Sequence, residues 1–248
     1  MVLLRGGTAT FSSDPMASHL KIIQGNLFRS TCQTLVNTVN CVGVMGAGLA
    51  FECRLRYPQM HEHYLALCQQ GKLDIGLLWL CKSTTPWVLN FPTKRHWKYP
   101  TKPEYLHQGL QKFMATYQER GVTSVAFPLL GAQNGGLTAE QSLGLMTSYL
   151  ERCSIPVEIY RHDPTAADDC YDRFKAVVQS MADDEIRART GLRMGAIARV
   201  RDALADARIC QLNQLVQVPR IGEKTLEKCF ALAMGRAGAG PAQVALGL

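Results

Sequence analysis

The sequence lacks long hydrophobic runs, and this absence excludes one broad class of proteins. No segment approaches the roughly 18 consecutive apolar residues that a membrane-spanning helix requires. The apolar run Val2–Leu4 is also too short to form the core of a signal peptide. We therefore expect no membrane association and a cytoplasmic protein.

The sequence also lacks closely paired residues of the kind that bind metals. Its nine cysteines are odd in number and scattered, and they contain no Cys-x-x-Cys pair, which argues against both a disulfide framework and a zinc site. His61 and His63 are two residues apart, whereas side chains that share one helix face are three or four apart. We expect reduced thiols, no bound metal and no resident cofactor.

Charged residues are few, and acidic ones are the scarcer kind. They make up 19% of the chain, with 27 Lys or Arg against 20 Asp or Glu and a formal net charge of +7. The resulting pI of about 9.0 favours an acidic partner such as nucleic acid or a phosphorylated ligand. Solubility alone would also explain this charge.

The first two thirds of the chain show a regular alternation of strands and helices. A polar and basic segment, residues 92–103, interrupts this alternation. Expected strands occupy residues 20–24, 35–40, 77–82, 87–91, 123–127 and 157–160, and expected helices occupy 48–57, 60–70, 104–120 and a segment ending near 152. This order predicts a three-layer α/β/α domain with a mixed sheet.

The composition changes after Tyr160, which indicates a second domain. From about residue 171 every segment has a helical pattern, and residues 175–248 contain 11 Lys or Arg against seven Asp or Glu. The expected division is a disordered tail over 1–17, an α/β domain over 18–162, an all-α domain over 172–234 and a flexible tail over 235–248.

Two glycine-rich loops carry the clearest chemical signal. Residues 36–50 pass from a β-branched strand through Gly46 and Gly48 into a helix. Glycine has no Cβ, so the backbone can approach a phosphate, and the helix N-terminus offers N–H groups and partial positive charge to the same anion. A second loop, residues 130–137, contains three more glycines and suits an anion-binding nest. The two loops predict a site for a phosphorylated ligand.

These loops also carry a family resemblance. Segments 25–27, 36–50 and 130–137 resemble the three ligand signatures of macrodomains, which bind ADP-ribose. More narrowly, Val-Asn-Cys-Val-Gly-Val-Met-Gly-Ala-Gly (39–48) and Asn-Phe-Pro-Thr-Lys-Arg-His-Trp-Lys (90–98) look like macrodomains of the DarG antitoxin type. That type belongs to the branch of the terminal ADP-ribose protein glycohydrolase. The alternative is an unrelated phosphate-binding loop of an α/β fold.

The resemblance implies an ADP-ribose site built from both loops. Asn26 would meet the exocyclic amine of adenine, where most macrodomains have Asp, because its side-chain oxygen can still accept a hydrogen bond. Tyr160 would stack on the adenine, although Tyr at a strand end is also common in simple packing. The full set expected to contact ADP-ribose is Asn26, Leu27, Val44, Met45, Gly46, Ala47, Gly48, Leu49, Leu130, Gly131, Ala132, Gln133, Asn134, Gly135, Gly136, Leu137 and Tyr160.

The second loop departs from the family pattern at two points. Ala132 and Gln133 stand where a small Cys/Ser-Gly pair is expected, which narrows the space around the distal ribose. The related glycohydrolase has a catalytic Asp in this loop, whereas this loop has no acidic residue. Asn134 lies nearby, but an amide cannot serve as a general base.

The resemblance assigns catalysis to Lys94 and Asn40. Asn40 would face the distal ribose and form hydrogen bonds with its hydroxyls. In the similar family the lysine of the Pro-Thr-Lys-Arg-His-Trp run is needed to remove ADP-ribose. An amine crowded by Arg95 and Lys98 would lose its proton more easily. It would then attack or polarise the anomeric carbon, or simply stabilise developing charge. A solvated basic loop is the alternative explanation of these charges.

The all-α part shows a second resemblance. Residues 209–216 predict a helix, 218–222 a hairpin and 223–232 another helix, as in the helix-hairpin-helix motif. The hairpin of that motif donates backbone N–H groups to a DNA phosphate without recognising the bases. Arg220 stands where the motif usually has its first Gly. The expected DNA-binding residues are Arg220, Ile221, Gly222, Lys224 and Thr225. A helical packing or dimerisation module is the alternative.

Together the two resemblances imply an enzyme that removes ADP-ribose from a DNA base, thymidine or guanine, while its C-terminal domain binds the DNA. The implied partners are ADP-ribosylated DNA, ADP-ribose and a cognate ADP-ribosyltransferase toxin. Two alternatives stay open. One is a hydrolase of O-acetyl-ADP-ribose or of ADP-ribosylated protein, and the other is a non-catalytic ADP-ribose reader that recruits DNA.

Overall fold

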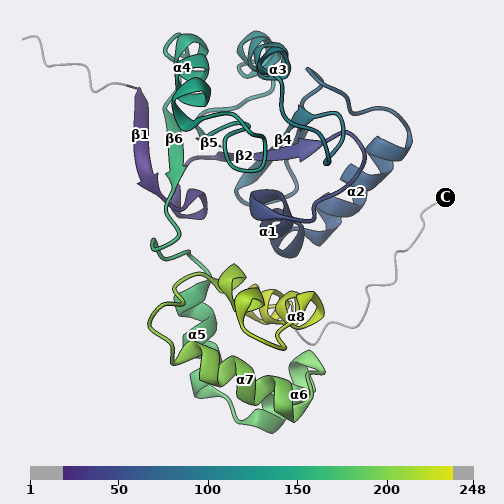
Figure 1. The fold of residues 1–248 in the computed structure, drawn as a ribbon, viewed down its shortest axis with the longest axis vertical. Helices are drawn as coiled ribbons and strands as arrows, with labels where there is room; N and C mark the ends of the chain where they lie inside the picture. Colours follow the sequence, from purple (N-terminus) through teal and green to yellow (C-terminus); the bar gives the residue numbers. More distant parts are fainter. Residues whose placement is uncertain (1–18, 237–248) are drawn as a thin grey trace, which may run out of the picture.

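The computed structural model describes residues 19–236, which form two parts, one above the other in Figure 1. The upper part contains the sheet with its covering helices, and the lower part contains only helices. The tail expected over 1–17 lies outside the described residues, as does all of the tail expected over 235–248 except Gly235 and Arg236.

The described strands form one mixed sheet in the order β1-β6-β5-β2-β4-β3. Neighbouring strands are parallel, except that β3 is antiparallel to β4. The strands are β1 (Leu20–Gly25), β2 (Thr34–Asn40), β3 (Trp79–Cys81), β4 (Trp87–Lys94), β5 (Val125–Pro128) and β6 (Val157–His162). The predicted mixed sheet is confirmed. Because five of its strands are parallel, their carboxyl ends meet at one edge.

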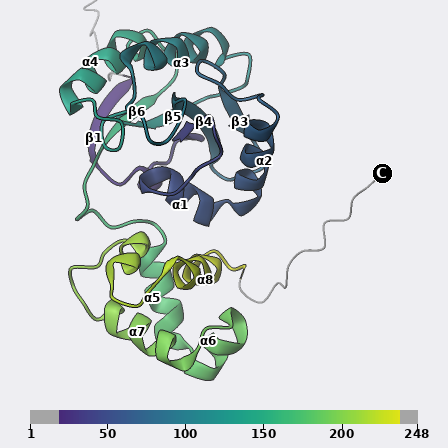
Figure 2. The same cartoon turned by 45° about the vertical axis from the view of Figure 1, so that its right-hand side comes forward.

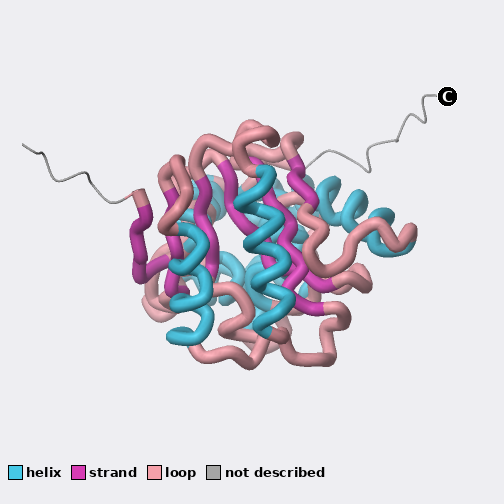
Figure 3. The backbone as a smooth tube through the Cα atoms, turned by 90° about the horizontal axis from the view of Figure 1, so that it is seen from above, coloured by secondary structure: helices cyan, strands magenta, loops and turns pink. Residues whose placement is uncertain are grey.

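Helices cover both faces of the sheet, which confirms the predicted three layers (Figure 3). On one face Phe113 and Met146 pack with Phe127 of β5. On the other face Cys53 and Tyr64 belong to a separate core. The first face carries α3 (Pro103–Thr116) and α4 (Ala139–Leu150), and the second carries α1 (Gly48–Arg56) and α2 (Pro58–Gln69), with the short 3-10 helix η1 (Leu27–Arg29) at the end of β1.

Strand β4 is longer than the sequence predicted. The expected strand ended at residue 91, with a polar segment after it, whereas β4 continues to Lys94. The register explains how the strand accommodates Pro92, which has no N–H. Val39 pairs with Pro92 and Asn40 pairs with Lys94, so Thr93 is an extra residue in a bulge. Bulges are among the few places where a sheet tolerates proline. This bulge places Lys94 directly opposite Asn40.

The lower part contains helices only, as predicted. They are α5 (Tyr171–Ser180), α6 (Asp183–Thr190), α7 (Met194–Leu204), the 3-10 helix η2 (Leu212–Gln217) and α8 (Glu223–Ala233). The α-helix predicted over 209–216 is wrong in type and start. Leu212 and Leu215 are both fully buried, and their spacing of three residues matches the three residues per turn of a 3-10 helix.

The two parts meet where α8 lies against α1 (Figures 1 and 2). Leu55 of α1 packs into the core of the helical part. The Arg56 side chain is 2% exposed, and its guanidinium lies 2.6 Å from a carboxylate oxygen of Glu52 and 2.8 Å from one of Asp169. The same guanidinium lies 3.8 Å from the ring centroid of Phe28. The junction is therefore a buried contact that uses both charge and apolar packing, rather than a flexible linker.

Residues 19–236 show no sign of a membrane span, a disulfide or a metal cluster. No helix in this range combines the length and apolar character needed to cross a bilayer. All nine cysteines fall in this range and each is a free thiol. In the same range no group of three or more His, Cys, Asp and Glu side chains is placed to hold a metal ion.

Candidate functional site

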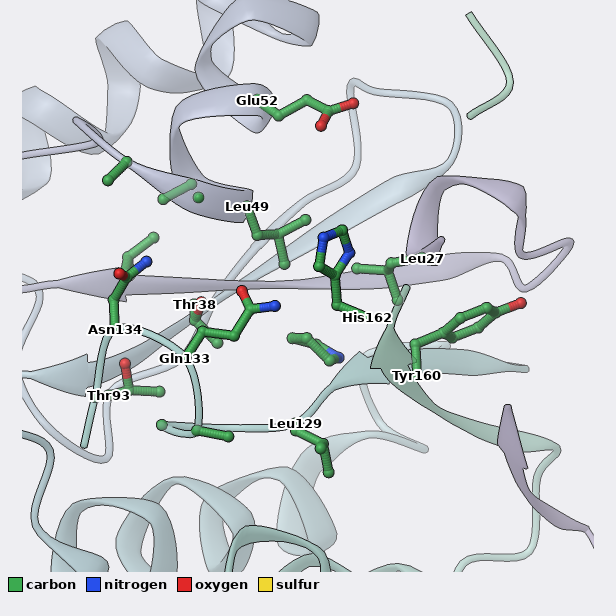
Figure 4. A pocket seen from close by; sticks show the side chains of 18 of the residues that line it. Leu27, Thr38, Leu49, Glu52, Thr93, Leu129, Gln133, Asn134, Tyr160 and His162 are labelled. Atoms are coloured by element: carbon green, nitrogen blue, oxygen red, sulfur yellow. The ribbon is translucent and has the colours of Figure 1, made fainter. Parts of the chain in front are cut away.

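A cavity of about 820 Å³ opens at the carboxyl ends of the parallel strands. Ligands of open α/β sheets usually bind at this edge, and the volume is in the range of pockets that hold a nucleotide-sized molecule. Both glycine-rich loops line the cavity, together with the ends of β1, β2, β4 and β6. Figure 4 shows Gln133 and Leu49 reaching into the same space from the two loops.

The first loop is held by the side chain of Asn40, the last residue of β2. Its amide N–H donates to the carbonyl of Val44 at 2.5 Å, and its Oδ1 accepts the N–H groups of Val42 at 3.0 Å and Val44 at 3.2 Å. The Tyr64 hydroxyl donates to the Asn40 carbonyl at 2.8 Å. Both ends of the amide are thus engaged within the protein. Asn40 shapes the first loop, a role that the sequence did not predict, and its contact with the distal ribose stays a prediction.

The second loop is closed by backbone hydrogen bonds. The Leu137 N–H donates to the Gly131 carbonyl at 3.1 Å, and the Thr101 N–H donates to the Gly135 carbonyl at 2.9 Å. A Cβ on Gly135 would lie 2.2 Å from the Gly131 oxygen, so only glycine fits there. The two loops also meet. A Cβ on Gly48, which has φ +57°, would lie 2.9 Å from the Asn134 side chain.

Lys94 is the last residue of β4 and lines the cavity together with both loops. Its ammonium donates a hydrogen bond to the Asn134 carbonyl of the second loop. Burial lowers the pKa of Lys94 below that of an ordinary lysine. The sequence predicted this direction, but the predicted cause is wrong. The pKa is lowered by burial, whereas the sequence analysis ascribed the shift to the neighbouring cations Arg95 and Lys98.

The expected adenine end of the cavity differs in detail from the prediction. The side-chain oxygen of Asn26 already accepts the Phe28 N–H at 2.9 Å, which leaves one lone pair for a ligand. Tyr160 is 7% exposed and belongs to the core on the α1 face. In Figure 4 its ring points away from Gln133, whereas His162 points toward Leu49. The stacking of Tyr160 on adenine stays a prediction. His162 also lines the cavity and offers a second aromatic ring for such stacking.

Most residues expected at the ligand do line this cavity. Those that line it are Asn26, Leu27, Asn40, Val44, Gly46, Ala47, Gly48, Leu49, Lys94, Gly131, Ala132, Gln133, Asn134, Gly135 and Tyr160. Met45, Leu130, Gly136 and Leu137 are not among its lining residues. Met45 and Leu130 are almost fully buried, and each packs into one of the two cores that flank the sheet.

The helical part supplies one wall of the cavity, which sequence reasoning missed. Asn213 of η2 and Glu52 of α1 both line it, and the Asn213 amide donates to the Glu52 carboxylate at 2.6 Å. Gln211 also lines it, and its amide donates to the carbonyls of Asp163 at 3.0 Å and Ala166 at 2.7 Å. No local motif marks these residues, because they reach the cavity only through the packing of the two parts.

The hairpin expected at DNA lies outside this cavity, at the start of α8. The Ile221 N–H donates to the Val218 carbonyl at 3.0 Å, and Ile221 is 3% exposed. Arg220 has φ +67°, a left-handed conformation that glycine adopts most easily. Lys224 and Gly222 are exposed beside it, and Thr225 is half-buried.

The fold and the two loops define the class of protein. The Macro domain family model matches residues 36–146. The structure of the macrodomain of Mycobacterium tuberculosis DarG superposes with a TM-score of 0.54 at 36% identity, covering 57% of this chain and 96% of that one. The chain therefore belongs to the macrodomain family.

Two further relatives narrow the similarity. The DNA ADP-ribosyl glycohydrolase of Thermus aquaticus is 36% identical over 149 residues, which are 58% of this chain and 41% of the relative. The DNA ADP-ribosyl transferase-DNA ADP-ribosyl glycohydrolase fusion protein of Thermosipho africanus is 33% identical over 164 residues, 58% of this chain and 42% of the relative. A structure of Thermosipho africanus DarTG in complex with ADP-ribose superposes with a TM-score of 0.54 at 34% identity, over 58% of this chain and 42% of that one. The chain thus spans about two fifths of the length of these curated relatives.

The wall formed by the helical part generates a prediction. Replacing Asn213→Ala removes a lining amide and leaves a Glu52 oxygen without its partner. If ADP-ribose occupies the cavity, its affinity should fall about three- to tenfold, the range expected for one lost hydrogen bond. Calorimetric titration with ADP-ribose measures this. The matched control is Gln217→Ala, an exposed amide on the same short helix that does not line the cavity. Equal affinities for Asn213→Ala and the unmodified protein would show that the wall does not contact the ligand.

Proposed function

We propose that the chain is an ADP-ribosyl glycohydrolase that releases ADP-ribose from a modified base of DNA, thymidine or guanine. The observation that carries this proposal is the position of Lys94. Its amine is partly desolvated and lines the cavity with both glycine-rich loops, and Lys94 pairs with Asn40 in the sheet. The names of the relatives support it, since they include a DNA ADP-ribosyl glycohydrolase and a DarTG complex with ADP-ribose.

In the proposed complex the pyrophosphate lies between the two loops. The first loop and the N-terminal residues of α1 line the cavity, and the N-terminus of a helix favours an anion. The adenine occupies the end near Asn26 and His162, and the distal ribose lies near Lys94. The anomeric carbon of that ribose, which carries the DNA base, then lies within reach of the Lys94 amine.

The chemistry follows from the protonation state of Lys94. In the neutral form its nitrogen attacks the anomeric carbon while the bond to the base breaks, and the base leaves with the electron pair and takes a proton. Water then hydrolyses the lysine adduct, which frees ADP-ribose and restores the amine. In the alternative form the protonated amine stabilises the charge that develops on the leaving base. In either path one N–H of Lys94 can stay bonded to the Asn134 carbonyl, which orients the amine.

The helical part would hold the DNA itself. Its hairpin exposes Arg220, Gly222 and Lys224 at the N-terminus of α8, a helix end that no side chain caps. Backbone N–H groups at such an end can meet a phosphate. A transferase that attaches ADP-ribose to DNA would supply the substrate. The Thermosipho relative joins a transferase and a glycohydrolase by name, which supports such a partner.

The central prediction concerns Lys94. Lys94→Ala should lower the release of ADP-ribose from an ADP-ribosylated oligonucleotide by at least about a hundredfold, the usual scale for loss of a reacting group. Lys94→Arg separates the two chemical forms, because arginine keeps the cation but offers no neutral amine at any ordinary pH. We expect Lys94→Arg to be as inactive as Lys94→Ala. Activity in Lys94→Arg would favour the charge-stabilising form.

The dependence of the rate on pH tests the protonation state of Lys94 independently of substitution. Because burial lowers the pKa of Lys94, the neutral amine appears at a lower pH than in free lysine. The rate should rise with pH through an apparent pKa below the value of about 10.4 for free lysine.

An ADP-ribosylated protein and O-acetyl-ADP-ribose should be poorer substrates than the oligonucleotide. Binding of ADP-ribose with release from none of the three would instead make the chain a reader.

Another prediction concerns the hairpin. Arg220→Ala should weaken binding to duplex DNA and reduce the slope of log affinity against log salt by about one, because one phosphate contact is lost. Arg208→Ala, a fully exposed arginine of the same part, is the control. Arg220→Gly should bind DNA as weakly as Arg220→Ala. It should unfold at a higher denaturant concentration than Arg220→Ala, since glycine adopts φ +67° without strain. An unchanged salt slope in both Arg220 variants would remove the hairpin from the DNA interface.

A further inference from the structure

The wall that the helical part adds to the cavity contains an amide whose oxygen has no protein partner. The Asn213 nitrogen donates to a carboxylate oxygen of Glu52, whereas no hydrogen bond to the Asn213 oxygen forms within residues 19–236. Asn213 is half-buried and lines the cavity. A half-buried acceptor without a partner is unfavourable unless water or a ligand bonds it. The proposed function does not use this oxygen.

Glu52 decides which end of the Asn213 amide faces away from it. The Glu52 side chain is 4% exposed, and two nitrogens of the Arg56 guanidinium lie 2.8 and 2.6 Å from its Oε1. The other oxygen, Oε2, accepts the Asn213 nitrogen at 2.6 Å. A carboxylate paired with a guanidinium only accepts hydrogen bonds, so the amide must turn its nitrogen to Glu52 and its oxygen away. This orientation is fixed before a ligand arrives, which favours binding.

The same amide lies at the end of the cavity that the proposed function assigns to adenine. The start of η2 is tied to the end of β6, because Gln211 donates to the carbonyl of Asp163, the residue after His162. His162 and Glu52 both line the cavity. Figure 4 shows both of them to the right of Asn134, which belongs to the second loop. The free oxygen is therefore placed for contact with the base of the nucleotide.

Two amide oxygens are thus available to one exocyclic amine. Asn26 keeps one lone pair for a ligand, and the Asn213 oxygen keeps both. The amine of adenine carries two N–H groups, so it can donate one to each oxygen. Hypoxanthine has a carbonyl oxygen in place of this amine and would set an acceptor against two acceptors. A site built to bond a ligand N–H rejects an analogue that lacks it, because the site's own polar groups are left unpaired.

We propose that Asn213 of the helical part determines the specificity for adenine by accepting one N–H of its exocyclic amine, and that Glu52 is the residue that positions the Asn213 amide. This step rests on the proposed function, which places adenine at this end of the cavity. The ligand class is a nucleotide whose purine has a free 6-amino group. The helical part then selects the nucleotide, in addition to its proposed contact with DNA.

Calorimetric titration with two nucleotides, in the absence of DNA, tests this proposal. They are ADP-ribose and its deaminated analogue inosine diphosphate ribose, which has a carbonyl oxygen in place of the amine. The unmodified protein should bind ADP-ribose at least about tenfold more tightly than the analogue. Asn213→Ala should lower this ratio about three- to tenfold, because only ADP-ribose loses a hydrogen bond. Gln217→Ala, an exposed amide of the same short helix, should leave the ratio unchanged.

Glu52→Gln tests the positioning role separately. The oxygen of the introduced amide stays with the Arg56 guanidinium, so its nitrogen faces Asn213 and turns that amide over. Asn213 then donates into the cavity, and the ratio should fall further than in Asn213→Ala, in favour of the inosine analogue. If Glu52 has only a structural role, both nucleotides should lose affinity equally. The unfolding midpoint of each variant checks the fold, and Asn213→Ala, which removes no charge, decides the proposal if Glu52→Gln unfolds.

The outcomes separate this proposal from the proposed function. An adenine preference that Asn213→Ala leaves unchanged would overturn the specificity role, and so would equal losses of affinity for both nucleotides. Neither result bears on the release of ADP-ribose from modified DNA, which is measured separately. A protein that selects adenine through Asn213 but releases no ADP-ribose from DNA would overturn only the proposed function.

Discussion

The structure of the candidate site depends on one side chain, the carboxamide of Asn40. It bonds three backbone groups of the first loop and therefore fixes the path of the chain from β2 into α1. The adjoining bulge sets Lys94 opposite Asn40, and the Lys94 ammonium in turn bonds the second loop. One buried amide thus fixes the relative positions of both loops and the amine. A site of this kind is preorganised, because its groups are positioned by the sheet and not by the ligand.

The helical part is coupled to the same site through α1. The N-terminal turn of α1 faces the cavity, while its C-terminal turn carries Leu55 and Arg56 into the contact with the helical part. Between them Glu52 bonds Arg56 on one side and Asn213 on the other. Binding in the cavity and docking of the helical part therefore act on one short helix.

Much of the fold could be predicted from the sequence, because period-two and helical patterns are local. The sheet, its three layers, the all-α second part and both loops followed from such patterns. The extension of β4 could not be predicted, since Pro92 argues against a strand unless a bulge is foreseen. Nor could the actual cause of the lowered Lys94 pKa be predicted, because it is burial of the amine, which depends on how the chain packs around it. Asn213 and Gln211 lie far from both loops in sequence and reach the cavity only through tertiary packing.

The most direct measurement of the central claim is a crystal structure of the protein with ADP-ribose bound. We expect the pyrophosphate between the two loops and the adenine near Asn26 and His162. The anomeric carbon should lie about 3 to 3.5 Å from the Lys94 nitrogen, the separation needed for attack. A reversed nucleotide with its distal ribose beside Asn213, or a pyrophosphate outside the two loops, would contradict the account.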